Sequence, residues 1–228
     1  MTYPTQTATL GNLAVEQNKV LRNTYMMLSL TMIPTIIGAF IGTSLNLAIM
    51  AEHPIISALV MFGVMMGMLF AVSALRDSVW GIVALLGFTF VAGVFLGPIL
   101  QVALHFKNGA QLVGLAAGGT GLIFFSLATI ATVTKKDFSF MGKFLFIGMI
   151  LLIVASLANL FFQIPALSLT ISAIAVMIFS AYILYDVSRI VHGGETNYVM
   201  ATLGLYMSIY NLFISLLQLL MAFGGERD

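Results

Sequence analysis

The sequence predicts an all-α polytopic membrane protein with seven transmembrane helices. Hydrophobic residues make up 61% of the 228 residues and charged residues 7%, whereas a typical soluble domain is about 45–50% apolar and about 25% charged. The mean hydropathy of +1.09 agrees with this. The apolar runs do not alternate with polar residues, as the strands of an outer-membrane barrel would. The chain is therefore expected to be a helical bundle in a bilayer and not a soluble domain.

The charged residues divide the chain into six long uncharged runs, and each can hold a span of about 20 apolar residues. The run from 144 to 185 is long enough for two spans, and Gln163, Ile164 and Pro165 lie near its middle. Proline removes a backbone donor and disfavours helix at the residue before it, so this run is expected to break there. The predicted spans are about 25–50, 54–75, 79–104, 109–133, 144–163, 166–186 and 198–223.

Residues 1–22 are expected to form a polar cytoplasmic tail, and residues 23–228 the seven-helix domain. The tail lacks the apolar core of a cleavable signal peptide. We expect it to be loose at first and to become an interfacial helix around Leu13–Leu21. Gly97 and Pro98 are expected to break or kink the third span.

Basic residues predict the orientation, because cytoplasmic loops carry an excess of Lys and Arg. A cytoplasmic N-terminus places seven basic residues on the cytoplasmic side: Lys19, Arg22, Arg76, Lys135, Lys136, Lys143 and Arg189. The other side then holds Lys107 and Arg227. With seven spans, the C-terminus is expected to be periplasmic, and the protein is expected in the bacterial inner membrane.

Composition and spacing exclude most catalytic classes. The net charge of +1 offers no basic field for nucleic acid, and the chain has no cysteine for a thiolate site or nucleophile. His53, His105 and His192 lie at span ends without metal-ligand spacing. An intramembrane aspartyl protease needs two carboxylates that share a proton, but the last span after Asp186 has no Asp before Asp228 at the terminus. We therefore expect no enzyme, no cofactor and no metal site.

Four pairs of glycines four residues apart lie in the first four spans: Gly38/Gly42, Gly63/Gly67, Gly93/Gly97 and Gly114/Gly118. Such pairs let two helix backbones approach closely, either within the bundle or between two copies of the chain. Packing within the bundle is the expectation for all four, because it is the ordinary use of this pattern in membrane helices.

The seventh span carries a polar stripe. Its members are spaced by 4, 3, 4 and 3 residues and share one helix face: Gly204, Ser208, Asn211, Ser215 and Gln218. Lipid penalises Asn and Gln side chains, so the stripe is expected to face protein or water, with the helix near the bundle centre. It is either a hydrogen-bonded packing seam or the lining of a cavity or permeation path.

Asp186 is the one carboxylate expected within a span, near the cytoplasmic end of the sixth. An ionisable group in a span is a functional candidate by default. Arg189 lies at i+3, a spacing that allows an ion pair, and Arg76 is a second candidate partner on the same side. Two roles remain open for Asp186: a structural ion pair, or a sensor of cytoplasmic pH that gates the protein.

Several motifs resemble the Bax-inhibitor-1 family over nearly the whole chain. They are Gly-Pro-Ile-Leu at 97–100, Tyr-Ile-Leu-Tyr-Asp at 182–186 and Tyr-Asn-Leu-Phe at 210–213. A further motif, together with residues 201–211, is similar to the proteobacterial YccA-like subgroup: Gly193, Gly194, Glu195, Thr196, Asn197 and Tyr198. The resemblance implies a bundle with the seventh helix at its centre.

The resemblance also implies two functions. Some bacterial members are pH-sensitive calcium leak proteins with two Asp residues in a shared-proton pair; Asp186 matches the first, and Ser208 stands at the second position. A serine cannot replace the second carboxylate of such a coupled pair. The subgroup instead binds and restrains the FtsH-type AAA protease of the membrane, limiting degradation of membrane proteins. We expect this second function, with a calcium or other cation leak as the alternative.

Overall fold

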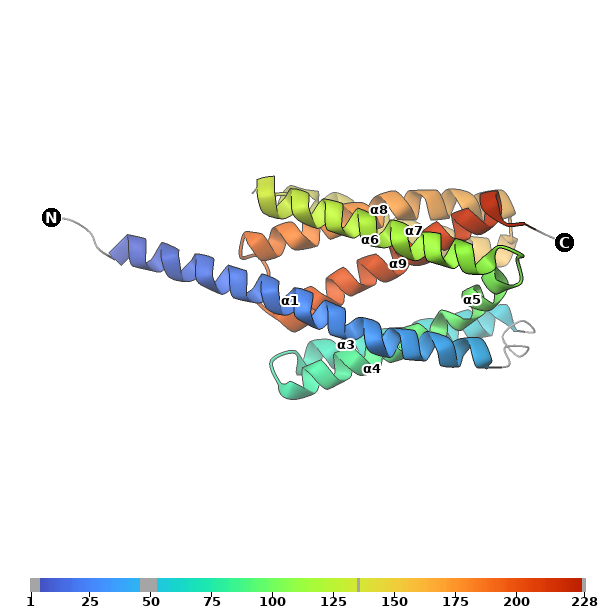
Figure 1. Ribbon diagram of the computed structural model, residues 1–228, viewed down its shortest axis with the longest axis horizontal. Helices are drawn as coiled ribbons and strands as arrows, with labels where there is room; N and C mark the ends of the chain where they lie inside the picture. The colour runs from blue at the N-terminus through green and yellow to red at the C-terminus, as the bar shows by residue number, and fades with distance from the viewer. Residues whose placement is uncertain (1–4, 46–52, 135, 227–228) are drawn as a thin grey trace.

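The computed structural model describes residues 5–45, 53–134 and 136–226, which are helical with short connections and contain no strand. Figure 1 shows a bundle of long helices with the two termini at opposite ends. Seven helical stretches in the described part are long and apolar enough to cross a membrane, which confirms the predicted fold class. The predicted end of the first span, 46–50, lies outside the described residues, as do residues 1–4 of the predicted tail.

The helices follow the predicted spans closely. They are α1 (Thr5–Ser44), α3 (Pro54–Leu75), α4 (Val79–Phe95), α5 (Gly97–Leu104), α6 (Gly109–Thr134), α7 (Gly142–Phe162), α8 (Pro165–Val191) and α9 (Tyr198–Gly224). A short 3₁₀ turn, η1 (Ser139–Met141), precedes α7. Helix α8 continues past the predicted end at residue 186, so Asp186 lies inside it.

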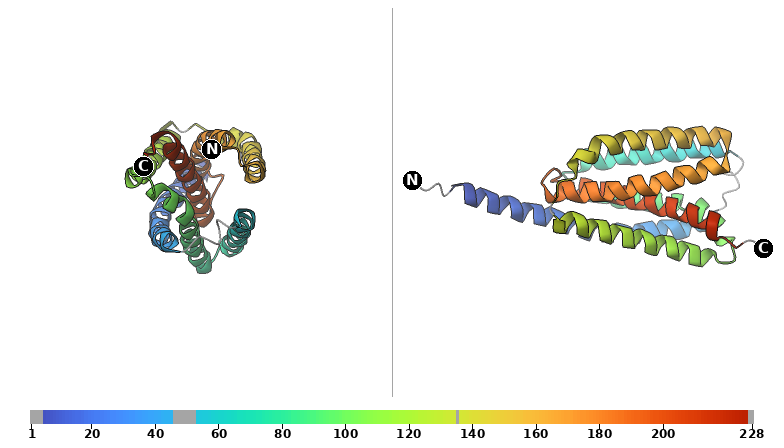
Figure 2. Two further views of the ribbon diagram at one scale, coloured as in Figure 1. Left: turned by 90° about the vertical axis from the view of Figure 1, so that its right-hand side faces the viewer. Right: turned by 90° about the horizontal axis from the view of Figure 1, so that it is seen from above.

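The expectation of a loose start to the tail is wrong for residues 5–12. Helix α1 begins at Thr5 and continues without a break into the first span. Extending an existing helix costs far less than nucleating one, so a long membrane helix can propagate into a preceding polar segment. Figure 2 shows this N-terminal part of α1 extending beyond the ends of the other helices.

Both predicted proline breaks are present. Helix α4 ends at Phe95, and α5 begins at Gly97 with Pro98 in its first turn. Helix α7 ends at Phe162. Its C-cap residue, Gln163, adopts a left-handed conformation with φ 51° and donates its N–H to the Asn159 carbonyl oxygen at 2.8 Å. Helix α8 then begins at Pro165. The N–H groups of a first turn have no acceptor within the helix, so the missing N–H of proline costs no hydrogen bond there.

Two of the four glycine pairs pack inside the bundle. A Cβ atom at Gly38 or Gly42 would overlap the backbone of α4, and one at Gly93 or Gly97 would overlap the backbone of α1. These four glycines therefore bring α1 against α4 and α5.

The expectation of internal packing is wrong for the other two pairs: Gly63, Gly67, Gly114 and Gly118 have no atom within 4 Å of a built Cβ. Identical spacing thus has different uses, because the surroundings of each helix decide whether a glycine face is covered.

Helix α9 contacts α1, α3, α4, α5, α6 and α8. Its buried side chains include Leu205, Tyr206 and Leu212, which belong to the main apolar core. Helices α3 and α7 contact fewer neighbours, and much of their surface is exposed for lipid. The polar groups of α9 are therefore held among other helices.

Candidate functional site

Asp186 lies near the C-terminal end of α8 and faces α9. The Ser208 hydroxyl donates to Asp186 Oδ2 at 3.4 Å and also to the Gly204 carbonyl oxygen at 3.1 Å. Glycine at 204 leaves room for the carboxylate, because a Cβ there would lie 3.4 Å from Oδ2. A cavity of about 310 Å³ adjoins Asp186 and is lined by residues of α3, α8 and α9 and by Glu195 of the α8–α9 loop.

Arg189 forms its ion pair with the loop and not with Asp186, within the described part of the chain. Its Nη2 lies 3.5 Å from Glu195 Oε2 and donates to the Gly194 carbonyl oxygen at 3.1 Å. Its guanidinium also lies over the Tyr185 ring, 5.6 Å from the centroid. The pairing expected from the i+3 spacing is replaced because the loop carboxylate meets Arg189 at the helix end, where the charge stays partly hydrated.

Arg76 does not reach Asp186 either. Its Nε lies 3.5 Å from Asp77 Oδ2, and both side chains are largely exposed. An exposed pair of this kind contributes little to stability. Asp186 therefore lies against Ser208 and Gly204. The two arginines form their ion pairs with loop residues instead.

The first half of the 193–198 motif ends α8 and turns the chain. Gly193 has φ 76°, a conformation that glycine adopts without the steric penalty of a side chain. The N–H groups of Gly194 and Glu195 donate to the Arg189 carbonyl oxygen at 2.8 and 3.3 Å. These bonds satisfy a carbonyl that the end of the helix leaves open.

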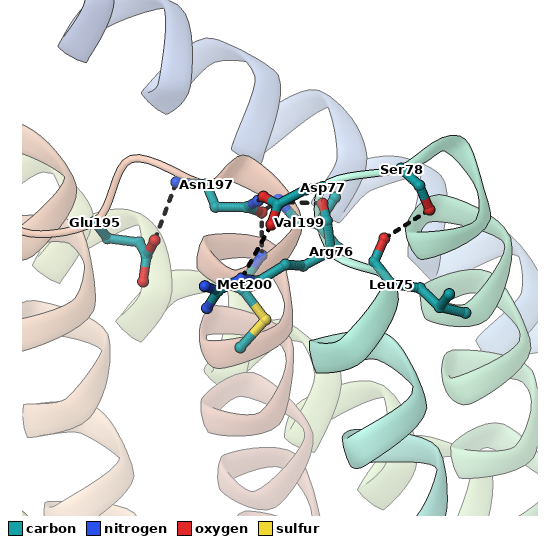
Figure 3. Close-up of polar contacts among 8 residues, drawn as sticks. All are labelled: Leu75, Arg76, Asp77, Ser78, Glu195, Asn197, Val199 and Met200. Carbon is teal, nitrogen blue, oxygen red and sulfur yellow. Dashed lines mark hydrogen bonds and ion pairs between the residues drawn. The ribbon is translucent and has the colours of Figure 1, made fainter.

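Asn197 joins two loops and begins α9, as Figure 3 shows. Its Oδ1 accepts from the N–H groups of Val199 at 2.9 Å and Met200 at 3.1 Å, an N-cap. Its Nδ2 donates to Asp77 Oδ1 at 2.8 Å and to the Arg76 carbonyl oxygen at 3.1 Å in the α3–α4 loop.

The rest of the motif supports this cap. Glu195 Oε1 accepts from the Asn197 N–H at 3.0 Å, Thr196 lies in the loop between them, and Tyr198 begins α9. The sequence singled out these residues as a motif but contained no signal for the bridge to the α3–α4 loop.

The polar stripe of α9 bonds mainly to its own helix. Asn211 Nδ2 donates to the Met207 carbonyl oxygen and Ser215 Oγ to the Asn211 carbonyl oxygen, each at 2.8 Å. Gln218 is bonded across helices instead: its Oε1 accepts from Ser172 Oγ of α8 at 2.6 Å. Of the two alternatives, these bonds favour the packing seam, because Asn211, Ser215 and Gln218 each have a hydrogen-bond partner within the bundle.

A buried hydroxyl cluster joins α1, α4 and α9, and the sequence analysis did not find it. The hydroxyls of Thr35 and Tyr206 lie 2.8 Å apart, and Thr35 Oγ1 lies 3.2 Å from the Thr89 carbonyl oxygen. Tyr210, stacked on Tyr206, donates to the Ala92 carbonyl oxygen at 2.9 Å. The four-residue spacing of the two tyrosines was the one available signal.

An apolar groove of about 530 Å³ runs along α9 between α1 and α6. In the described part of the chain these two helices meet through the edge-to-face pair of Tyr25 and Phe124, whose ring centroids lie 6.1 Å apart. Ile36 and Ala39 line one side, Ala117 and Gly121 the other, and Phe213 lies on α9. The groove is consistent with a face turned to the hydrocarbon of the bilayer.

The fold and these interior contacts define a polytopic α-helical membrane protein. The described residues contain no group of three or more His, Asp or Glu side chains that could hold a metal ion. The chain belongs to the Bax inhibitor-1 family: the family model described as "Inhibitor of apoptosis-promoting Bax1" matches residues 17–225.

Three relatives are similar along almost their whole length. An uncharacterised protein of Pseudomonas aeruginosa is 43% identical over 211 residues, covering 92% of each chain. An uncharacterised membrane protein of Vibrio cholerae is 42% identical over 221 residues, covering 95% of this chain and 94% of the relative.

The "Modulator of FtsH protease YccA" of Escherichia coli K12 is 41% identical over 203 residues, covering 89% of this chain and 90% of that protein. A second Escherichia coli relative of the same similarity is named an inner membrane protein. With its seven apolar helices, the chain is a multi-pass protein of the bacterial inner membrane.

Proposed function

We propose that this protein is a non-enzymatic regulator that binds and restrains an FtsH-type AAA protease, and so limits degradation of membrane proteins. The observation that carries the proposal is the similarity, over 89% of the chain, to a protein named modulator of FtsH protease. The proposal includes a cytoplasmic N-terminus, supported by the basic residues on that side, and α9 as the central helix, supported by its contacts with six helices.

The projecting start of α1 supplies a site for the protease to grip. An ATP-driven protease pulls a chain from an accessible end, and the N-terminal part of α1 extends beyond the ends of the other helices. A lone helix without tertiary contacts is only marginally stable in water, so it offers little resistance to unwinding. The seven-helix body behind it resists extraction, and the gripped protein acts as a poorly processed competitor.

The geometry does not favour the alternative, a pH-sensitive calcium leak. The partner of Asp186 is the hydroxyl of Ser208 and not a second carboxylate. Beyond Ser208, Asn211 and Ser215 donate to carbonyl oxygens of α9 itself, and Gln218 accepts from Ser172 of α8. Calcium and proton flux in liposomes, compared between the protein and its Asp186→Asn variant, tests this conclusion; a flux that depends on Asp186 would reverse it.

Co-purification from mildly solubilised membranes tests the regulator. We expect the protease to be recovered with the protein, and a reporter substrate of that protease to decay more slowly when the protein is overproduced. Absence of both effects would contradict the proposal.

The tail has its own test. Deleting residues 2–15 should slow turnover of this protein, and a Gly/Ser segment of equal length should restore it, because the grip requires an accessible length of chain. Unchanged turnover of the truncated protein would show that the protease enters elsewhere.

A further inference from the structure

The second half of α1 is held far more firmly than the first. Helix α1 packs most extensively against α4, and it also contacts α5, α8 and α9. The close contacts described below begin at Thr35, whereas the start of the helix projects from the bundle. Any force applied to the N-terminus is therefore transmitted along α1 to this distal half.

Backbone-to-backbone packing is the first part of the attachment. A side chain at Gly38 would overlap the carbonyl of Phe90, and a side chain at Gly93 would overlap the backbone of Thr35. Gly42 and Gly97 are likewise in direct contact with each other's backbone. Side-chain rotation cannot relieve contacts of this kind, so the two helices separate only by moving as rigid bodies.

Hydrogen bonds are the second part. Thr35 lies within bonding distance of Tyr206 and of the Thr89 carbonyl oxygen, at 2.8 and 3.2 Å. At the far end of α1, Gln101 Nε2 of α5 donates to the carbonyl oxygens of Thr43 at 2.9 Å and Leu45 at 3.0 Å. Gln101 thus satisfies carbonyls that the end of α1 leaves without a helical partner. Polar groups that lose such partners within a bilayer find no water to replace them.

All these contacts are loaded together when α1 is pulled along its axis. The glycine contacts slide in shear, and the bonds of Thr35 and Gln101 must break before α1 can leave the bundle. We propose that this α1 lock, made of Gly38, Gly42, Gly93, Gly97, Thr35 and Gln101, decides whether the protein remains a held competitor of the protease or becomes its substrate. This inference rests on the proposed function, because it assigns the residues that resist extraction.

Two alanine substitutions test the lock, one at a glycine packed against another helix and one at a glycine in open space. Gly93→Ala places a methyl group against the Thr35 backbone, whereas the control Gly118→Ala places the same group where no atom lies within 4 Å. Gln101→Leu removes the bonds to the end of α1 without adding a backbone clash, and it serves if Gly93→Ala does not fold. Two quantities are measured: the lifetime of each protein in cells with and without the protease, and the force that extracts α1 when a single molecule in a bicelle is pulled by its N-terminus.

We expect Gly93→Ala and Gln101→Leu to lower the extraction force and to shorten the protease-dependent lifetime by about 5- to 30-fold, the factor that 1–2 kcal/mol represents. Gly118→Ala should match the unaltered protein in both. An unchanged force would show that the contacts form no lock. The extraction force could fall while the lifetime in protease-containing cells stays unchanged and the protein still co-purifies with the protease. That result would show that the lock does not decide whether the protein is degraded. A lowered force without any recovered complex would overturn the proposed function and, with it, the role of the lock in protection.

Discussion

Replacing Asn197 with alanine removes four hydrogen bonds at once. Two are accepted by Oδ1 at the start of α9, and two are donated by Nδ2 to the α3–α4 loop. The substitution therefore weakens an N-cap and a connection between loops that are 120 residues apart in sequence. The connection matters because α3 has few contacts beyond α4.

The expected loss of stability follows from these contacts. Loss of an N-cap costs about 1 kcal/mol. Each bond to the α3–α4 loop adds about 0.5–1.5 kcal/mol, and the bond to Asp77 stays in that range because its carboxylate is 79% exposed. The sum is about 2–4 kcal/mol. For a chain of this size, about 2–4 °C of Tm accompanies each kcal/mol, so a decrease of about 4–16 °C is expected.

Thermal unfolding in one detergent measures the total loss of stability, and hydrogen exchange shows which segments lose it. Asn197→Ser keeps an acceptor for the cap but loses the reach to Asp77, so it should recover about 1 kcal/mol of the loss. Asn18→Ala, at an exposed position of α1, is the control. Exchange should increase at residues 76–79 as well as in the first turn of α9. If the increase is confined to α9, the bridge to the α3–α4 loop contributes nothing and the reasoning is wrong.

Three further outcomes are expected. Gly193→Ala should lower stability by about 1–2 kcal/mol, since alanine is strained at φ 76°, and a Tm equal to that of the unaltered protein would contradict this. Ser172→Ala should cost about 1–2 kcal/mol by removing the bond to Gln218, and hydrogen exchange should then rise at the C-terminal end of α9 rather than at its start. The Ser139 hydroxyl and backbone N–H hold the pKa of Asp137 below its ordinary value, so any contribution of this carboxylate to stability is present at neutral pH and lost as pH falls through the lowered pKa. Ser139→Ala should raise that pKa in a carbon-13 NMR titration, and an unchanged midpoint would show that the hydroxyl has no effect.

The helices and their breaks were predictable because they depend on local properties of the chain. A bilayer requires long apolar segments, and Pro98 and Pro165 lie where one helix ends and the next begins, whereas Pro34 lies inside the continuous helix α1. The starting point of α1 was less predictable, since the polar residues before Lys19 carry no signal that distinguishes a tail from an extended helix.

The partners of individual side chains were beyond local reasoning. Gly38 and Gly63 stand in the same pattern, yet one lies against a backbone and the other in open space. Helical spacing allowed an ion pair between Arg189 and Asp186, but the structure pairs Arg189 with Glu195, which follows the turn at Gly193. Such choices depend on how distant segments pack, and the motif at 193–198 located the right region without indicating its bonds.

The position of α9 after all the helices it contacts has a consequence for biogenesis. Tyr206 meets Thr35 across 171 residues of sequence, and α9 fills space among six helices synthesised before it. These six helices form five of the spans that precede α9, and they enter the bilayer before the surface that joins them exists. Assembly of the bundle has to wait until α9 has been synthesised, and during that interval the buried polar groups of α1 and α8 are exposed to quality control. Loss of α9 would leave an unfinished bundle and not a shorter version of the same protein.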